Sequence, residues 1–169
     1  MIKYFGYGSN KDLDMMTHMV GRDDLKGEPG KLLGYELCVQ RLDQIRDKKP
    51  VSPREIVRSG FGDTFYLFVA REKPGSEING TIWDLTPEEL ELVKNWEMTD
   101  LGMQEEVNAK ATDLRGNIID VETQAVINPP PEIDRVVTDP KYDPYIVAKE
   151  RMLSVADNVR EDFLKRIPK

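Results

Sequence analysis

The sequence has a single cysteine, Cys38, and a single histidine, His18. One cysteine cannot form a disulfide within the chain, which is consistent with a reducing compartment. With so few cysteines and histidines, the sequence excludes Cys/His zinc fingers and metalloproteases of the H-E-x-x-H type.

Long hydrophobic runs and an excess of basic residues are also missing. No apolar segment is long enough to span a bilayer, and the N-terminus lacks the basic and apolar regions of a signal peptide. The net charge of −7 and the pI of about 4.9 argue against a nucleic acid or an anionic membrane as the main partner. We therefore predict a cytoplasmic protein with a single domain, residues 1–169. The oligomeric state is left open.

The first ten residues, MIKYFGYGSN, indicate a strand that ends in a glycine turn. Two glycines flank Tyr7, and glycine permits a positive φ or a close approach of the backbone. Ser9 and Asn10 are N-cap candidates for a helix over residues 11–20 that Gly21 ends. The amides of such a turn can bind a carboxylate or a phosphate. Because no complete phosphate-binding motif is present, the spacing alone favours a turn without a ligand.

Apolar runs separated by turn signals predict two β-hairpins. In the first, residues 61–71 pair with residues 78–85 around a turn at residues 73–76. In the second, residues 103–111 pair with residues 118–126.

The remaining segments are predicted from proline positions and apolar periodicity. A strand is expected over residues 30–42, followed by a polar loop over residues 41–59 with one helical turn near residues 53–57. The three prolines at 129–131 predict a stiff connector. Residues 143–144 predict the start of an amphipathic C-terminal helix that packs on the sheet.

The clearest helix in the sequence covers residues 86–97. Thr86 is its N-cap, Pro87 takes the first helical position, and Glu89 completes a capping box. On a helical wheel with ~100° per residue, Glu97 falls within the apolar arc at the last turn. Burial and the negative end of the helix dipole would raise the pKa of that carboxyl group toward the range of a general base. If the helix frays before its end, Glu97 lies in solvent instead, and the wheel does not distinguish the two.

Together these segments resemble the γ-glutamylcyclotransferase-like family, which includes the AIG2-like and γ-glutamylamine cyclotransferase-type proteins. The resemblance covers residues 2–126 and rests on four motifs: the loop Tyr7-Gly8-Ser9-Asn10, the G-x-I-W-D-L strand at residues 80–85, Glu97 at the end of the next helix, and the pair Gly102-Met103. It implies an α+β fold with a mixed, partly closed β-barrel and flanking helices.

The resemblance also implies a reaction. In this family the α-amine of a γ-glutamyl group attacks its own γ-carbonyl, which releases 5-oxoproline and a free amine. Glu97 would then be the catalytic acid/base, and the loop would bind the small γ-glutamyl substrate through Tyr7, Gly8, Ser9 and Asn10. The family uses neither a metal nor an organic cofactor, so none is expected here.

Two departures from the family pattern leave alternatives open. Met98 stands where the family often has Gly, and Gln104 stands where it often has Tyr. These changes motivate an alternative function, a non-catalytic module that binds a small carboxylate or a γ-glutamyl ligand. A hydrolase that uses Ser9 or Cys38 with His18 is a further alternative. The sequence does not identify the leaving amine.

Overall fold

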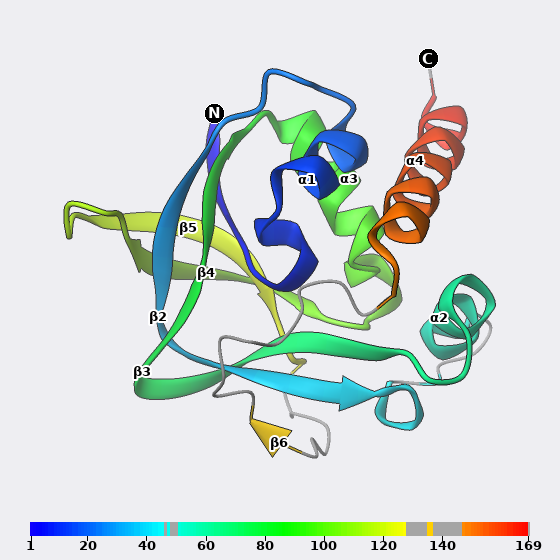
Figure 1. Ribbon diagram of the computed structural model, residues 1–169, viewed down its shortest axis with the longest axis horizontal. Coiled ribbons are helices and arrows are strands. Elements are labelled where there is room, and N and C mark those ends of the chain that lie inside the picture. The colour runs from blue at the N-terminus through cyan, green and yellow to red at the C-terminus, as the bar shows by residue number, and fades with distance from the viewer. Residues whose placement is uncertain (46, 48–50, 128–134, 137–146, 169) are drawn as a thin grey trace.

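The structure is a computed structural model that describes residues 1–45, 47, 51–127, 135–136 and 147–168. Within these residues six strands form one mixed sheet in the order β3-β1-β5-β4-β2-β6 (Figure 1). Their bounds are β1 Ile2–Gly6, β2 Gly27–Arg41, β3 Tyr66–Leu85, β4 Glu105–Thr112, β5 Ile118–Ala125 and β6 Arg135–Val136. Because β2 also pairs with β3, five of the strands form a closed barrel. β1 and β5 are parallel and the other pairs are antiparallel, so the predicted mixed barrel of an α+β fold is confirmed, and it is closed.

Helices cover one side of the barrel and one of its ends. They are α1 Leu13–Val20, α2 Pro53–Phe61, α3 Pro87–Trp96 and α4 Lys149–Arg166, with 3₁₀ turns at Gly8–Lys11, Leu42–Gln44 and Thr99–Leu101. α4 mainly contacts α1 and α3 (Figure 1). Its Met152 and Ala156 join the same core cluster as Tyr4 and Trp83 of the sheet, so the predicted packing on the sheet is shared with the other two helices. None of the described helices is both long and apolar enough to cross a membrane.

The core has two main parts, and β1 separates them. Alternate side chains of a strand point to opposite faces, so Tyr4 packs among the helices while Phe5 packs inside the barrel. Three methionines of α1 join the helical side, together with Trp83, Leu90 and Met152. The barrel interior is filled by Leu32, Ile78, Ile82 and Val121, among others.

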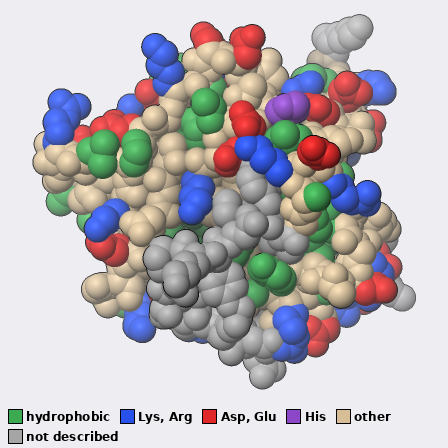
Figure 2. All heavy atoms as spheres, in the orientation of Figure 1, with side chains coloured by type: hydrophobic (Ala, Val, Ile, Leu, Met, Phe, Trp, Pro, Cys, Tyr) green, Lys and Arg blue, Asp and Glu red, His purple; other side chains and the backbone are tan. Residues whose placement is uncertain are grey.

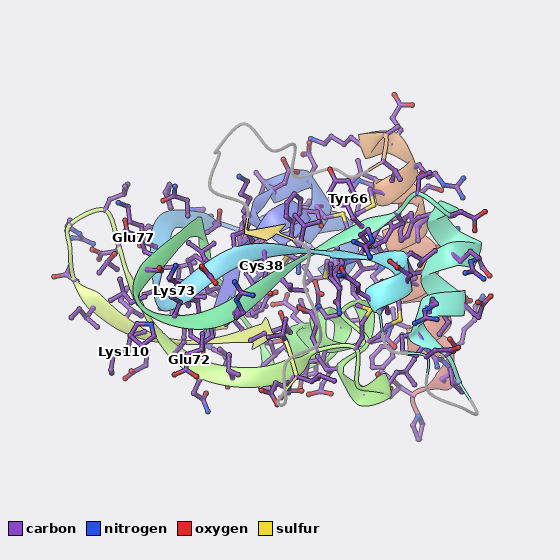
Figure 3. All side chains as sticks on the ribbon, turned by 90° about the horizontal axis from the view of Figure 1, so that it is seen from below. Cys38, Tyr66, Glu72, Lys73, Glu77 and Lys110 are labelled. Carbon is purple, nitrogen blue, oxygen red and sulfur yellow. The ribbon has the colours of Figure 1, made fainter. Side chains whose placement is uncertain are left out.

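The first predicted hairpin is wrong, because β3 is one bent strand of 20 residues. Both halves of β3 pair with β2 in the antiparallel sense, and the register shifts between Leu33 and Tyr35. Residues 73–76 form the irregular segment opposite this shift, because Pro and Gly mark bulges as well as turns. Figure 3 shows Lys73 and Glu77 toward the end of the barrel that is remote from α2 and α4.

Several other predictions of secondary structure are confirmed, with adjusted bounds. The second hairpin is formed by β4 and β5, and α3 has the predicted cap: Thr86 Oγ1 accepts from the Glu89 amide at 3.2 Å, and Glu89 accepts from the Thr86 amide at 2.9 Å. The expected single turn near residues 53–57 is the longer helix α2, which Ser52 caps. The predictions for residues 129–131 and 143–144 lie outside the described residues.

The glycine turn after β1 uses its two glycines in different ways. A Cβ atom at Gly6 would lie 2.1 Å from the carbonyl oxygen of Asn10, so the chain approaches its own backbone there. Gly8 has a φ of 59°, which glycine adopts at little cost. The predicted N-caps are wrong: Gly8–Lys11 forms a 3₁₀ turn, and Asp12 caps α1 by accepting from the Met15 amide.

Opposite charges are interspersed on the surface. Exposed pairs include Lys3–Asp84 at 2.8 Å, Lys31–Glu77 at 2.9 Å and Lys110–Asp120 at 2.6 Å. Figure 2 shows acidic and basic side chains mixed over the visible face. Exposed pairs of this kind contribute roughly 0–1 kcal/mol each, so they add little to stability.

Backbone geometry predicts that alanine has opposite effects on stability at Gly8, in the turn, and at Gly60, in α2. Gly8→Ala forces an L-residue into a positive φ and places Cβ 3.3 Å from Phe68, so it should lower the free energy of unfolding by about 1–3 kcal/mol. Gly60 lies within α2, and a Cβ atom added there would have no neighbour within 4 Å. Gly60→Ala should therefore raise the free energy of unfolding by about 0.5–1 kcal/mol. Urea denaturation measures both, and a stable Gly8→Ala variant would contradict the assigned turn.

Candidate active site

The length of β1 and the length of α3 bring Asn10 and Glu97 together. Ile2 pairs with Leu85, so β1 begins beside the end of β3, where α3 also begins. The five residues of β1 extend about 17 Å and the ten residues of α3 about 15 Å. Since both elements run the same way from this common start, the loop after β1 and the C-terminus of α3 end at the same level (Figure 1).

Glu97 is the C-cap of α3, and its side chain turns toward the loop. Its amide donates to the Val93 carbonyl at 2.9 Å, so the helix does not fray before this residue. Oε1 accepts a hydrogen bond from Asn10 Nδ2 at 2.6 Å, and Oε2 accepts one from Gln104 Nε2 at 2.5 Å. Both carboxyl oxygens are thus fixed by side-chain amides from separate segments of the chain.

Asn10 belongs to a buried network that also includes Tyr4 and Gln124. Its Nδ2 lies 3.0 Å from Tyr4 Oη, which donates to Gln124 Oε1 at 2.8 Å. All three residues are at least 97% buried. The Oδ1 atom of Asn10 is buried as well and has no hydrogen-bond partner among the described residues. A buried acceptor without a partner is costly, so this atom calls for a ligand or a water molecule.

Tyr7 supports the site from inside the barrel. Its hydroxyl donates to the Gln124 carbonyl at 2.8 Å and accepts from the Ala70 amide at 3.1 Å. It also lies 3.3 Å from Gln104 Oε1, so Gln104 connects Tyr7 to Glu97. Gln104, noted above as a departure from the resemblance, therefore holds the carboxyl group in place.

Burial is the main influence on the ionisable groups of the site. It raises the pKa of the Glu97 carboxyl group, and the hydrogen bonds from Asn10 and Gln104 only partly offset this effect by stabilising the anion. Burial also raises the pKa of Tyr4 and of Tyr7, and the negative charge of Glu97 raises them further. Both tyrosines therefore remain neutral donors while Glu97 titrates.

A pocket of about 390 Å³ opens beside this carboxyl group. Its volume lies within the roughly 300–1,000 Å³ that is usual for small-molecule sites. All four residues of the predicted loop line it, as does Glu97, so the structure brings the predicted site residues together: Tyr7, Gly8, Ser9, Asn10 and Glu97. No described residue accepts a hydrogen bond from the backbone amides of Gly8 and Ser9.

The residues of the hydrolase alternative are not brought together. His18 Nδ1 lies 2.9 Å from both carboxylate oxygens of Asp157, which joins α1 to α4. Cys38 is fully buried on β2 (Figure 3), and burial raises the pKa of its thiol. Ser9 lines the pocket, but neither His18 nor Cys38 does.

Several residues of the site were not predicted from the sequence. Tyr4 and Gln124 each lie in a run of consecutive buried residues in their strands, and nothing local distinguishes them from other buried residues. Met98 has a φ of 52°, a left-handed conformation that strains a side chain of this kind. This conformation gives the physical reason why a glycine suits the position after the glutamate, and the methionine side chain lines the pocket instead.

No protein-family model matches the sequence, and no curated protein sequence is significantly similar to it. Solved structures match over 99% of the chain. A gamma-glutamyl cyclotransferase is 15% identical, with a TM-score of 0.59 and 88% of its chain covered. An uncharacterized protein from Homo sapiens is 16% identical, with a TM-score of 0.55 and 88% covered. YkqA from Bacillus subtilis is 16% identical, with a TM-score of 0.54 and 55% covered.

These similarities establish the fold. The chain has the fold of gamma-glutamyl cyclotransferase, as the resemblance predicted, and the match extends over nearly its whole length. At 15% identity the activity does not follow from the fold, so it is argued below from the site.

The hydrogen bond from Gln104 predicts how the pKa of Glu97 responds to substitution. Gln104→Met keeps the size of the side chain but removes a donor that stabilises the anion, so the pKa of Glu97 should rise further. Carbon-13 NMR titration of the carboxyl carbons, assigned with Glu97→Gln, measures the shift. Gln40→Met, a buried change on β2 that does not line the pocket, is the control and should leave the midpoint unchanged. A midpoint in Gln104→Met at or below that of the wild type would contradict the assigned contact.

Proposed function

We propose that the protein is a cyclotransferase that releases 5-oxoproline and a free amine from a γ-glutamyl compound. The observation that carries this proposal is the Glu97 carboxyl group, which two amides fix at the wall of a pocket and whose pKa is raised. A carboxylate with a raised pKa is a stronger base than an ordinary one, and its protonated form persists closer to neutral pH. The shared fold supports the same conclusion.

In the proposed reaction Glu97 carries two protons, one after the other, from the attacking nitrogen to the leaving nitrogen. It takes the first from the α-ammonium group of the substrate, and the freed amine attacks the γ-carbonyl carbon. The new carbon–nitrogen bond closes a five-membered ring, and the γ-amide bond to the leaving amine breaks. Glu97 passes the first proton to the departing nitrogen, and a second proton leaves the ring nitrogen by the same route. The 5-oxoproline amide is then neutral, the amine departs as an ammonium ion, and Glu97 is a carboxylate again. Ring closure is intramolecular, so the substrate itself supplies the proximity of the reacting atoms.

The loop holds the rest of the γ-glutamyl group in this proposal. The amides of Gly8 and Ser9, from which no described residue accepts a hydrogen bond, can donate to the α-carboxylate or to the oxygen that gains charge during attack. The unpartnered Oδ1 of Asn10 can accept from the α-ammonium group, which satisfies this buried acceptor and directs the ammonium to Glu97. Tyr7 forms a wall of the pocket, while its hydroxyl group is hydrogen-bonded to the Gln124 carbonyl in the barrel.

The test replaces the base by an amide of the same shape. Glu97→Gln should lower 5-oxoproline release by about 10²–10⁴-fold, because general acid–base catalysis of this kind is lost. Release is measured on a panel of γ-glutamyl amines and γ-glutamyl amino acids, with circular dichroism and calorimetry to show that fold and ligand binding are kept. Glu91→Gln, an exposed change on the same helix, is the matched control and should keep full activity.

Two outcomes would overturn parts of this proposal. Wild-type turnover by Glu97→Gln would refute the role of Glu97. Binding of γ-glutamyl compounds by the wild type without any release of 5-oxoproline would establish the alternative, a non-catalytic binding module of the same fold.

A further inference from the structure

The pocket has a polar end and an apolar end. The loop and Glu97 form the polar end. The apolar remainder is supplied by α2, by the start of β3, by the end of α3 with the segment after it, and by α4. Aromatic rings form much of this part: Phe61 stacks on Phe65 with ring centres 4.8 Å apart, and it meets Trp96 edge-on at 6.3 Å. Val57 and Val155 are among the aliphatic residues that line the same space.

Charged groups of the lining, apart from Glu97, are exposed. They are Asp100, Asp162 and Arg166. The guanidinium of Arg166 donates to Asn95 Oδ1 at 3.4 Å and to the Asp162 carbonyl at 3.3 Å. Among the described residues of the lining, Arg166 is the one cation and it is exposed, so the apolar part around Phe61, Phe65 and Trp96 offers no cation to a carboxylate. Asp100 and Asp162 are exposed as well, so a second ammonium group held among the apolar side chains would be buried away from these carboxylates, which is costly.

The position of Glu97 decides which part of a substrate meets this apolar end. To return its proton, the carboxyl group must reach the amide nitrogen of the leaving amine. The γ-glutamyl group occupies the polar end, so the body of the amine extends from Glu97 into the apolar end. We propose that the substrate is the γ-glutamyl amide of an apolar amine, alkyl or arylalkyl, which carries no charge beyond its nitrogen. This inference rests on the proposed function and deepens it.

The test compares leaving groups on the same γ-glutamyl donor. The 3-methylbutylamide and the 2-phenylethylamide represent the apolar class, while γ-glutamylglycine, γ-glutamylputrescine and Nε-(γ-glutamyl)lysine carry a carboxylate, an ammonium group or both. We expect kcat/KM for 5-oxoproline release to be at least about tenfold higher for the apolar amides. Equal or faster release from the charged compounds would overturn the inference and leave the proposed cyclotransferase intact.

A pair of neighbouring substitutions on α4 tests the location of the amine. Val155 is half-buried and lines the pocket, whereas Ser154 is exposed and does not. Val155→Asp should lower kcat/KM for the apolar amides at least tenfold and raise the relative rate with γ-glutamylputrescine. Ser154→Asp adds the same charge next to it and should keep the wild-type preference. Should Val155→Asp fold poorly by circular dichroism, Val155→Thr should shift the preference in the same direction by a smaller factor.

A binding measurement separates failure of this inference from failure of the proposed function. If the wild type releases 5-oxoproline from none of the compounds, calorimetry with the same panel still reports the preference of the pocket. Tighter binding of the apolar amides would support the apolar leaving group even though cyclisation fails. Equal or weaker binding would overturn it, as would a substrate preference in Val155→Asp that matches the wild type.

Discussion

The site depends on one hydrogen bond, from Asn10 Nδ2 to Glu97 Oε1 at 2.6 Å. It joins two residues that are 87 positions apart in the chain, and it forms because β1 and α3 start together and have nearly equal lengths. The barrel fixes β1 between β3 and β5, and the capping box at Thr86 fixes the start of α3. A shift of either element by one residue would separate the two side chains, so the barrel acts as the frame of the site.

The contacts of the Glu97 carboxyl group suit a proton acceptor whose pKa is raised, and not a carboxylate that stays charged at every working pH. A neighbouring cation would stabilise the charged form and lower its pKa, but both groups that contact Glu97 are neutral amides. Burial therefore keeps the pKa raised, and the amides fix the orientation of the oxygens. The strained φ of Met98 and the unpartnered Oδ1 of Asn10 lie in the same place. Such local costs are expected at functional sites, where the rest of the fold compensates for them.

Much of the fold could be predicted from the sequence because local signals determine it. The cap of α3 and the turn between β4 and β5 depend on residues a few positions apart. The sequence could not distinguish the bent strand β3 from a hairpin, because the pairing of β3 with β2 is a contact between residues far apart in the chain. Within the site, Glu97 was found by its place on the apolar arc of a helix. Its partner Gln104 was noted only as a departure from a family pattern, since side-chain contacts between distant segments leave no periodicity in a sequence.

The central claim is that the proton-accepting group of the reaction is the half-buried carboxyl group of Glu97. The most direct test is the pH dependence of kcat/KM for 5-oxoproline release, recorded beside the NMR titration of Glu97 in the same variants. Because protonated Glu97 cannot accept a proton, activity should fall as the pH decreases through its raised pKa, and Gln104→Met should move the kinetic midpoint and the NMR midpoint upward together. An acid limb that stays fixed while the NMR midpoint moves would contradict the claim.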